Sequence, residues 1–102
     1  MADIGKVIEG QLVEWDKKKA AINRQKHGVE FEDAALVFAD ENRIERYDAE
    51  HSTEENRWQV IGEVGEVLFV VYTERGEAFR LITARMATPE ERRIYYGAQN
   101  YL

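Results

Sequence analysis

The chain has 102 residues, of which 44% are hydrophobic and 33% are charged, so it suits one globular domain and not a disordered chain. It contains no cysteine, which excludes disulfides, thiolate catalysis and cysteine zinc sites. The longest apolar run, residues 67–72, is too short to span a bilayer, and the first residues lack the basic and apolar blocks of a signal peptide. We therefore expect a cytoplasmic protein with no membrane partner.

The first quarter of the chain predicts one strand and one polar helix. Residues 1–11 have no clear periodicity, and we expect an N-terminal extension there, with a single domain over residues 12–102. Leu12 to Trp15 indicates a short strand. Asp16 is a good helix N-cap and Gly28 a good helix stop, so the segment between them is predicted to be a helix over about 17–27.

The next segment predicts a second helix followed by a strand and a loop. Between residues 31 and 38 the apolar side chains recur at i, i+3, i+4 and i+7, which is the pattern of an amphipathic helix that ends near Ala39. Residues 43–47 indicate a strand, and the polar residues 48–56 indicate a loop.

The C-terminal half predicts three strands joined by tight turns, at residues 57–63, 67–73 and 78–85. Gly65 and Gly76 mark the two turns. Strands that follow one another through tight turns pair antiparallel, so we expect a meander.

The last helix has the clearest start signal. Thr88 can cap it, Pro89 suits its first position, and Glu91 completes a capping box. The expected order is then β-α-α-β-β-β-β-α, an α+β fold in which two N-terminal helices and one C-terminal helix pack on an antiparallel sheet.

Charge is distributed unevenly along the chain, whose formal net charge is −6. Residues 14–27 carry five basic and two acidic side chains, and residues 75–93 carry five arginines and three glutamates. Between them, residues 28–56 carry ten acidic side chains and two arginines. The acidic segment would repel RNA but suits a basic protein partner, although it could equally serve only to keep the domain soluble.

The motifs of several enzyme classes are absent. The sequence has no Walker loop, no dinucleotide fingerprint, no GxSxG elbow and no helical His-His pair for zinc. Arginine, histidine, glutamate and tyrosine candidates remain. RNA carries its own nucleophile, the 2′-hydroxyl, so a ribonuclease without metal needs a base, an acid and cations for the phosphate. The arginines suit the cationic role, because their planar fork binds phosphate oxygens.

Each candidate also has an ordinary structural explanation. His27 sits at a helix C-terminus, where capping explains it as well as catalysis does. Lys26 fits a solvated charge better than a phosphate ligand, and His51, in an acidic loop, fits a plain surface histidine better than a catalytic one. Arg80 and Arg85 lie at odd spacing on one strand, so only a bulge or a strand end would bring both to one face.

An ordered set of residues resembles the BrnT toxin family of type II toxin–antitoxin systems. The resemblance covers roughly residues 13–96 and includes Trp15-Asp16, Lys19, Asn23, Lys26-His27-Gly28-Val29, Phe31, Ala34, His51-Ser52, Arg57-Trp58, Ile61-Gly62, Val71-Tyr72-Thr73-Glu74-Arg75-Gly76, Arg80, Ile82, Ala84-Arg85, Ala87-Thr88, Glu91-Arg92 and Tyr95.

The resemblance implies a RelE-like fold and a toxin that cleaves RNA without a metal ion or cofactor and so inhibits translation. It also implies a BrnA-type antitoxin with a basic ribbon-helix-helix domain, through which alone the pair would bind DNA. The catalytic residues carried over from the resemblance are Lys26, His27, Arg57, Arg80, Arg85, Arg92 and Tyr95.

One departure leaves an alternative open. The family often has Glu immediately before the Arg-Trp pair, where this chain has Asn56, with Glu55 next to it. Asn56 and the net charge of −6 favour a non-catalytic module that keeps the fold and the antitoxin but has lost cleavage. The retained arginines favour the endoribonuclease. A third reading, a domain that binds a small molecule, has no sequence feature in its support.

Overall fold

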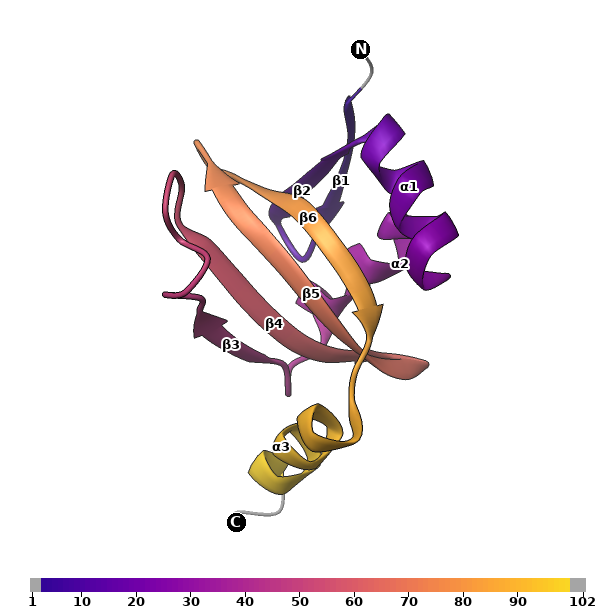
Figure 1. The fold of residues 1–102 in the computed structure, drawn as a ribbon, viewed down its shortest axis with the longest axis vertical. Helices are drawn as coiled ribbons and strands as arrows, with labels where there is room; N and C mark the ends of the chain where they lie inside the picture. The colour runs from indigo at the N-terminus through magenta and orange to yellow at the C-terminus, as the bar shows by residue number, and fades with distance from the viewer. Residues whose placement is uncertain (1–2, 100–102) are drawn as a thin grey trace.

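A computed structural model describes residues 3–99 as one mixed six-stranded sheet with helices on both faces (Figure 1). The elements in chain order are β1 (Asp3–Ile8), β2 (Gln11–Asp16), α1 (Lys17–His27), α2 (Phe31–Ala34), the 3-10 helix η1 (Ala35–Ala39), β3 (Ile44–Tyr47), β4 (Arg57–Val64), β5 (Glu66–Arg75), β6 (Ala78–Met86) and α3 (Pro89–Gln99).

The strands lie in the order β1-β2-β6-β5-β4-β3. Strands β3, β4 and β5 each pair antiparallel with the next strand along the chain. The expected purely antiparallel sheet is nevertheless wrong, because β2 pairs parallel with β6 through Val13 and Glu14. This pairing joins segments more than sixty residues apart, and no local pattern in the sequence signals it.

The N-terminal segment is a strand, so the expected element order, which begins at residue 12, is wrong because it lacks β1. β1 pairs antiparallel with β2 along its whole length. Glu9 and Gly10 form the turn between them, both with positive φ (49° and 83°), which matches the right-handed twist of a hairpin. The Glu-Gly turn is not one of the common hairpin signals. Val7 is exposed at the sheet edge, so the apolar residues of this segment do not alternate in the way that predicts a strand.

Helix α1 has the predicted bounds, and the predicted caps explain them. The Asp16 side chain accepts a hydrogen bond from the Lys18 backbone N–H (3.3 Å). Gly28 ends the helix in the left-handed conformation (φ 73°) and donates its N–H to Arg24. Its buried residue Asn23 fixes α1 to β6: the carboxamide donates to the carbonyl of Ala84 (2.9 Å) and accepts from the N–H of Ala84 (3.1 Å). Asn23 therefore replaces β2 as the hydrogen-bonding neighbour of this part of β6.

The second predicted helix is shorter and tighter than expected. One α-helical turn, α2, is followed by the 3-10 helix η1. Val37 of η1 packs against β4 at Gly62, where a Cβ would come within 3.0 Å of the Val37 Cβ. This close approach requires glycine at position 62. The i, i+3, i+4 pattern cannot separate the two helix types, since both bury the same residues.

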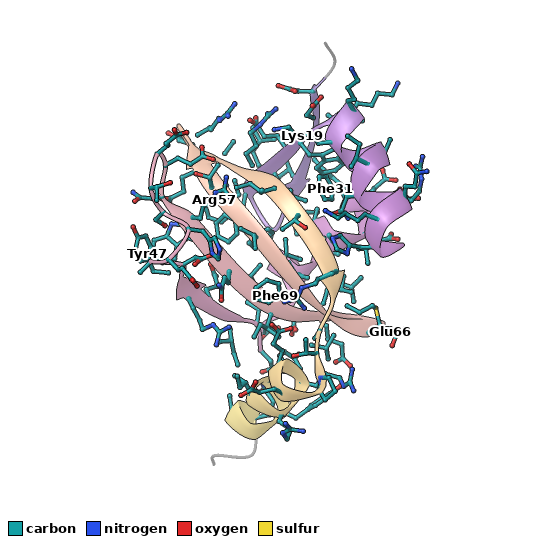
Figure 2. The ribbon with its side chains drawn as sticks, viewed as in Figure 1. Lys19, Phe31, Tyr47, Arg57, Glu66 and Phe69 are labelled. Atoms are coloured by element: carbon teal, nitrogen blue, oxygen red, sulfur yellow. The ribbon has the colours of Figure 1, made fainter. Side chains whose placement is uncertain are left out.

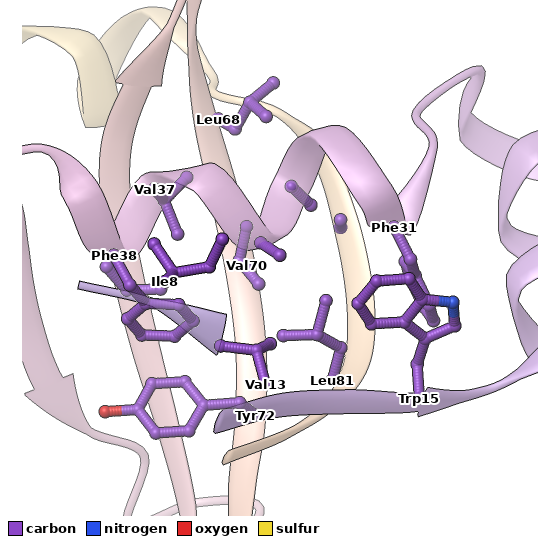
Figure 3. Close-up of a cluster of buried hydrophobic side chains, with 14 of the residues drawn as sticks. Ile8, Val13, Trp15, Phe31, Val37, Phe38, Leu68, Val70, Tyr72 and Leu81 are labelled. Atoms are coloured by element: carbon purple, nitrogen blue, oxygen red, sulfur yellow. The ribbon is translucent and has the colours of Figure 1, made fainter. Parts of the chain in front are cut away.

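Side chains pack on both faces of the sheet. The larger core lies beneath α2 and η1, where Phe31, Val37 and Phe38 pack against residues of β2, β5 and β6 (Figure 3). On the other face α3 covers a smaller cluster through Tyr95, at one end of the sheet. The rest of that second face, called here the open face, carries polar side chains.

A bulge in β6 decides which arginines share the open face. Tyr72 pairs with Leu81 and Val71 pairs with Thr83, so Ile82 is the extra residue. Arg80 and Arg85 are consequently opposite Thr73 and Phe69, which are four residues apart on β5. Both arginines therefore lie on the open face, as the sequence allowed only if a bulge separated them.

Candidate active site

A cavity of about 430 Å³ lies on the open face, between the loop of residues 48–56 and the first turn of α3. Its floor comes from neighbouring strands, because Gln59, Val71 and Thr83 form one row across β4, β5 and β6. Figure 2 shows Arg57 and Phe69 along the same face of the sheet. The lining residues are Arg46, Asp48, His51, Arg57, Gln59, Phe69, Val71, Thr83, Arg85 and Glu91.

A histidine held by a buried carboxylate forms one wall of this cavity. His51 Nδ1 lies 3.0 Å and 3.1 Å from the two oxygens of Asp48, whose side chain is 7% exposed. Burial works to raise the pKa of Asp48, but hydrogen bonds from His51 and Gln59 outweigh it and hold that pKa below its ordinary value. The pair fixes the ring and leaves Nε2, on a side chain that is 60% exposed, for a substrate.

The loop that carries this pair is closed by its own hydrogen bonds. Ser52 Oγ donates to the carbonyl of Asp48 (2.6 Å) and accepts from the backbone N–H of Arg57 (2.8 Å). The backbone N–H of Asp48 donates to the carbonyl of Arg57 (2.9 Å). These bonds join both ends of the loop to the start of β4, so His51 and Arg57 are held against the same strand.

Arg57 is the arginine of the cavity whose side chain donates no hydrogen bond to another described residue. Its guanidinium has one ion pair in the described residues, a long one of 3.7 Å to Glu55. Its Nε is buried and has no hydrogen-bond partner within residues 3–99. The side chain as a whole is 35% exposed and lines the cavity, so its terminal N–H groups can donate to an anion there.

The other two arginines of the cavity are held differently. Arg46 donates to the neutral side chain of Gln59 (2.9 Å and 3.1 Å), so this contact does not neutralise the positive charge of Arg46. Arg85 binds both carboxylate oxygens of Glu91 (2.8 Å and 3.0 Å) and lies over the Phe69 ring. Burial works to raise the pKa of Glu91, but the bonds from Arg85 and the N–H of Thr88 hold it below its ordinary value.

Arg80, which shares the open face, lies outside the cavity. Its guanidinium binds Glu14 (2.9 Å) and Asp3 (3.1 Å) and is 15% exposed. The hydrogen bond to Asp3 has the largest effect and raises the pKa of Arg80. Burial works to lower that pKa, but the bond to Glu14 adds to the increase, so the net shift is upward. Two carboxylates from the first hairpin thus occupy this arginine as a structural ion pair.

Two further residues carried over from the resemblance also lie outside the cavity. Tyr95 is buried and its hydroxyl donates to Asp40 (2.6 Å), so it anchors α3 to the segment after η1. Burial has the largest effect on the pKa of Tyr95 and the hydrogen bond to Asp40 the next largest, and both raise it. The Tyr95 hydroxyl is therefore a poor proton donor. Arg92 is exposed on α3 and donates to the carbonyl of Ala87 (3.3 Å).

Lys26 and His27 line a separate cavity of about 210 Å³ beside the β6 bulge. It is bounded by α1 on one side and by Ile82 and Thr83 on the other. Thr83 also lines the larger cavity, so the two are neighbours across β6. The structure therefore brings Arg57 and Arg85 together, with Lys26 and His27 next to them, and leaves Arg80, Arg92 and Tyr95 outside.

The sequence favoured a plain surface histidine at position 51, and the structure places this exposed side chain in the cavity beside Asp48. A signal was present, since Asp48 precedes His51 by three residues, a spacing that lets a turn bring the two side chains together. Asn56, at the position of the usual family glutamate, is exposed and accepts a hydrogen bond from the Tyr47 hydroxyl (2.9 Å). Asn56 is not among the residues that line the cavity.

Comparison with known proteins agrees with this fold. The model of the BrnT family, described as the ribonuclease toxin of a type II toxin–antitoxin system, matches residues 15–91, and the chain belongs to this family. Among solved structures, the chain is similar to the crystal structure of the Brucella abortus ribonuclease toxin BrnT. The TM-score is 0.55 at 24% sequence identity, over 83% of this chain and 99% of the other, so this likeness shows the fold. No curated protein matches the chain.

Membership of the family gives the general role. A type II toxin has a protein antitoxin, and a ribonuclease toxin acts on RNA. Strand β1 precedes the residues that the family model matches. None of the helices within residues 3–99 is long and apolar enough to cross a membrane.

Proposed function

We propose that this toxin is a metal-independent endoribonuclease whose active site is the cavity around His51 and Arg57. The observation that carries the proposal is the placement of a histidine, fixed by a buried aspartate, in one cavity with Arg46, Arg57 and Arg85. A base with an oriented ring and a set of cations meet two of the three requirements for cleaving RNA through its own 2′-hydroxyl, and water can serve as the acid.

In this mechanism His51 Nε2 takes the proton of the 2′-hydroxyl, and the 2′-oxygen attacks the adjacent phosphorus. The bond from phosphorus to the 5′-oxygen breaks, that oxygen takes a proton from water, and the hydroxide that remains takes the proton from the His51 imidazolium. The products are a 2′,3′-cyclic phosphate and a 5′-hydroxyl end. Asp48 stabilises the imidazolium that forms, and Arg57 binds the phosphate oxygens as their charge grows. Cutting messenger RNA in this way would inhibit translation.

A second candidate function has its own observation. Arg85 is already neutralised by Glu91 and Arg80 by Asp3 and Glu14, so fewer cations are available than the sequence suggests. This favours a non-catalytic module that keeps the fold and the antitoxin. Arg57 and Arg46, which have no close carboxylate partner among the described residues, favour the enzyme.

The experiment that separates the two functions is RNA cleavage by the purified toxin in EDTA. We expect cleavage at the same rate with and without EDTA, and products that end in a 2′,3′-cyclic phosphate. Strict dependence on added Mg²⁺ or Mn²⁺ would disprove the metal-independent mechanism. A correctly folded protein that leaves RNA intact under every condition would support the non-catalytic module.

The antitoxin is proposed to be a BrnA-type ribbon-helix-helix protein, through which the complex would bind DNA. Its basic half would approach the acidic segment of residues 28–56, where Glu32 and Asp33 of α2 are exposed. Asp40, in the same segment, is held by Tyr95 and by the backbone N–H of Glu63 (2.8 Å), so it serves the fold.

We expect the double variant Glu32→Lys/Asp33→Lys to associate with the antitoxin about tenfold more slowly at low salt, because surface charge steers encounter. RNA cleavage should not change. The matched control is Glu74→Lys/Glu77→Lys, which reverses two exposed acids at the β5–β6 turn. Equal association rates for the two double variants would remove the acidic segment from antitoxin recognition.

A further inference from the structure

We infer that the substrate RNA continues from the active-site cavity across β6 to helix α1, where Lys19 and Lys26 bind a flanking phosphate. This inference rests on the proposed function, because that function places the cut phosphate near Arg57. It adds a binding subsite and a minimum length to the substrate: a strand with at least one phosphate beyond the one that is cleaved.

The first support is the continuity of three cavities around the β6 bulge. The active-site cavity touches the α1 cavity at Thr83. A small third cavity of about 60 Å³ shares Arg57 with the active site and Lys19 with the α1 cavity. Each cavity therefore shares a lining residue with the other two, and the three lie next to one another between the loop of residues 48–56 and α1.

The second support is the geometry of the bulge. Strand β2 pairs with β6 only as far as Glu14 and Arg80, and Asn23 of α1 bonds the backbone of β6 further on, at Ala84. The last turn of α1 thus lies directly beside the open face at Ile82 and Thr83. Only strand β6 lies between the two cavities, and neighbouring strands in a sheet are about 4.8 Å apart.

The third support is the charge of the lining. Lys19 and Lys26 are exposed, and neither forms an ion pair with another of the described residues. The α1 cavity has no acidic lining residue, although Asp16 and Glu55 line the small third cavity. Two ammonium groups beside a cavity without an acidic lining residue suit a phosphate, and they favour no particular base. The occupant is therefore the RNA backbone.

The test combines cleavage and binding in the double variant Lys19→Gln/Lys26→Gln. On a 12-nucleotide RNA we expect its KM to rise about tenfold with little change in kcat. On a dinucleoside monophosphate, which has only the phosphate to be cut, KM and kcat should match those of the unmodified toxin. The control Lys17→Gln/Lys18→Gln removes the same charge from the same helix, at exposed positions that line none of the three cavities.

Binding of a 2′-O-methyl RNA 12-mer separates this inference from the proposed function, because that RNA lacks the nucleophile and cannot be cut. Loss of the contacts to one phosphate should reduce the slope of log Kd against log salt by about 0.7. The inference is wrong if the control weakens binding equally, or if the double variant loses the same activity on both substrates. A toxin that binds the 2′-O-methyl RNA with the expected lysine dependence but does not cleave unmodified RNA would overturn only the proposed function.

Discussion

Arg57→Ala is expected to lower RNA cleavage by about 10²- to 10³-fold, the effect of losing one preorganised donor to a transition-state charge. Arg57 suits this role because its side chain lines the cavity, and its ion pair with Glu55 is long, at 3.7 Å. Its side chain contributes little to the fold through those contacts, so thermal unfolding should change by only a few degrees. Initial rates on a labelled RNA, measured beside a thermal melt, give both quantities.

Two further variants define what Arg57 does. Arg57→Lys keeps the charge but loses the planar fork, so its rate should fall between those of the unmodified toxin and Arg57→Ala. Arg93→Ala removes an exposed arginine of α3 outside the cavity and controls for overall charge. If Arg57→Ala cleaves within threefold of the unmodified toxin, the guanidinium has no part in the chemistry.

Asn23→Ala is expected to lower the free energy of unfolding by about 3 kcal/mol. The carboxamide binds both backbone groups of Ala84 and also donates to the carbonyl of Val29 (3.0 Å). All three bonds are buried, and each unmade bond costs about 1 kcal/mol or more. Chemical denaturation measures the loss.

The matched control for this prediction is Gln25→Ala, an exposed amide on the same helix, which should cost less than about 0.5 kcal/mol. Asn23→Asp keeps the acceptor for the Ala84 N–H and loses both donors, so it should be destabilised as well. A loss below about 1 kcal/mol in Asn23→Ala would mean that α1 is held to β6 mainly by other contacts.

Local signals in the sequence predicted the elements whose ends are set by neighbouring residues. Asp16 and Gly28 bound α1, and Thr88 and Glu91 form the predicted capping box, with bonds of 2.9 Å and 3.1 Å between them. These contacts span two to four residues, so their spacing is visible in the chain. The resemblance to the BrnT family, confirmed by the family model, added the general fold.

Features without a local signal in the sequence were missed. Strand β1 is stabilised by its partner β2 and has no strong turn signal, and the parallel β2–β6 pair joins segments far apart in the chain. The bulge at Ile82 changes which side chains share a face, yet the residue itself looks like any apolar strand residue.

The candidate site shows the same limit. Arg57 and Arg85 were identified from the resemblance, and the structure places them in one cavity. His51 looked like a surface histidine, because the burial of Asp48 and the bonds that close the loop are properties of the folded chain. Arg80 looked available, because its partners Asp3 and Glu14 come from a hairpin that was only partly predicted.

Cleavage of a dinucleoside monophosphate in EDTA by His51→Asn and by His27→Asn tests the central claim most directly. Both substitutions replace an imidazole by a carboxamide, and the dinucleoside monophosphate is expected to bind in the active-site cavity alone. We predict that His51→Asn loses at least about 10²-fold in kcat, the usual contribution of a general base, while His27→Asn retains cleavage. Circular dichroism should show that both variants are folded. Full activity in His51→Asn, or loss of activity in His27→Asn alone, would contradict the assignment of the active site to the His51–Asp48 pair.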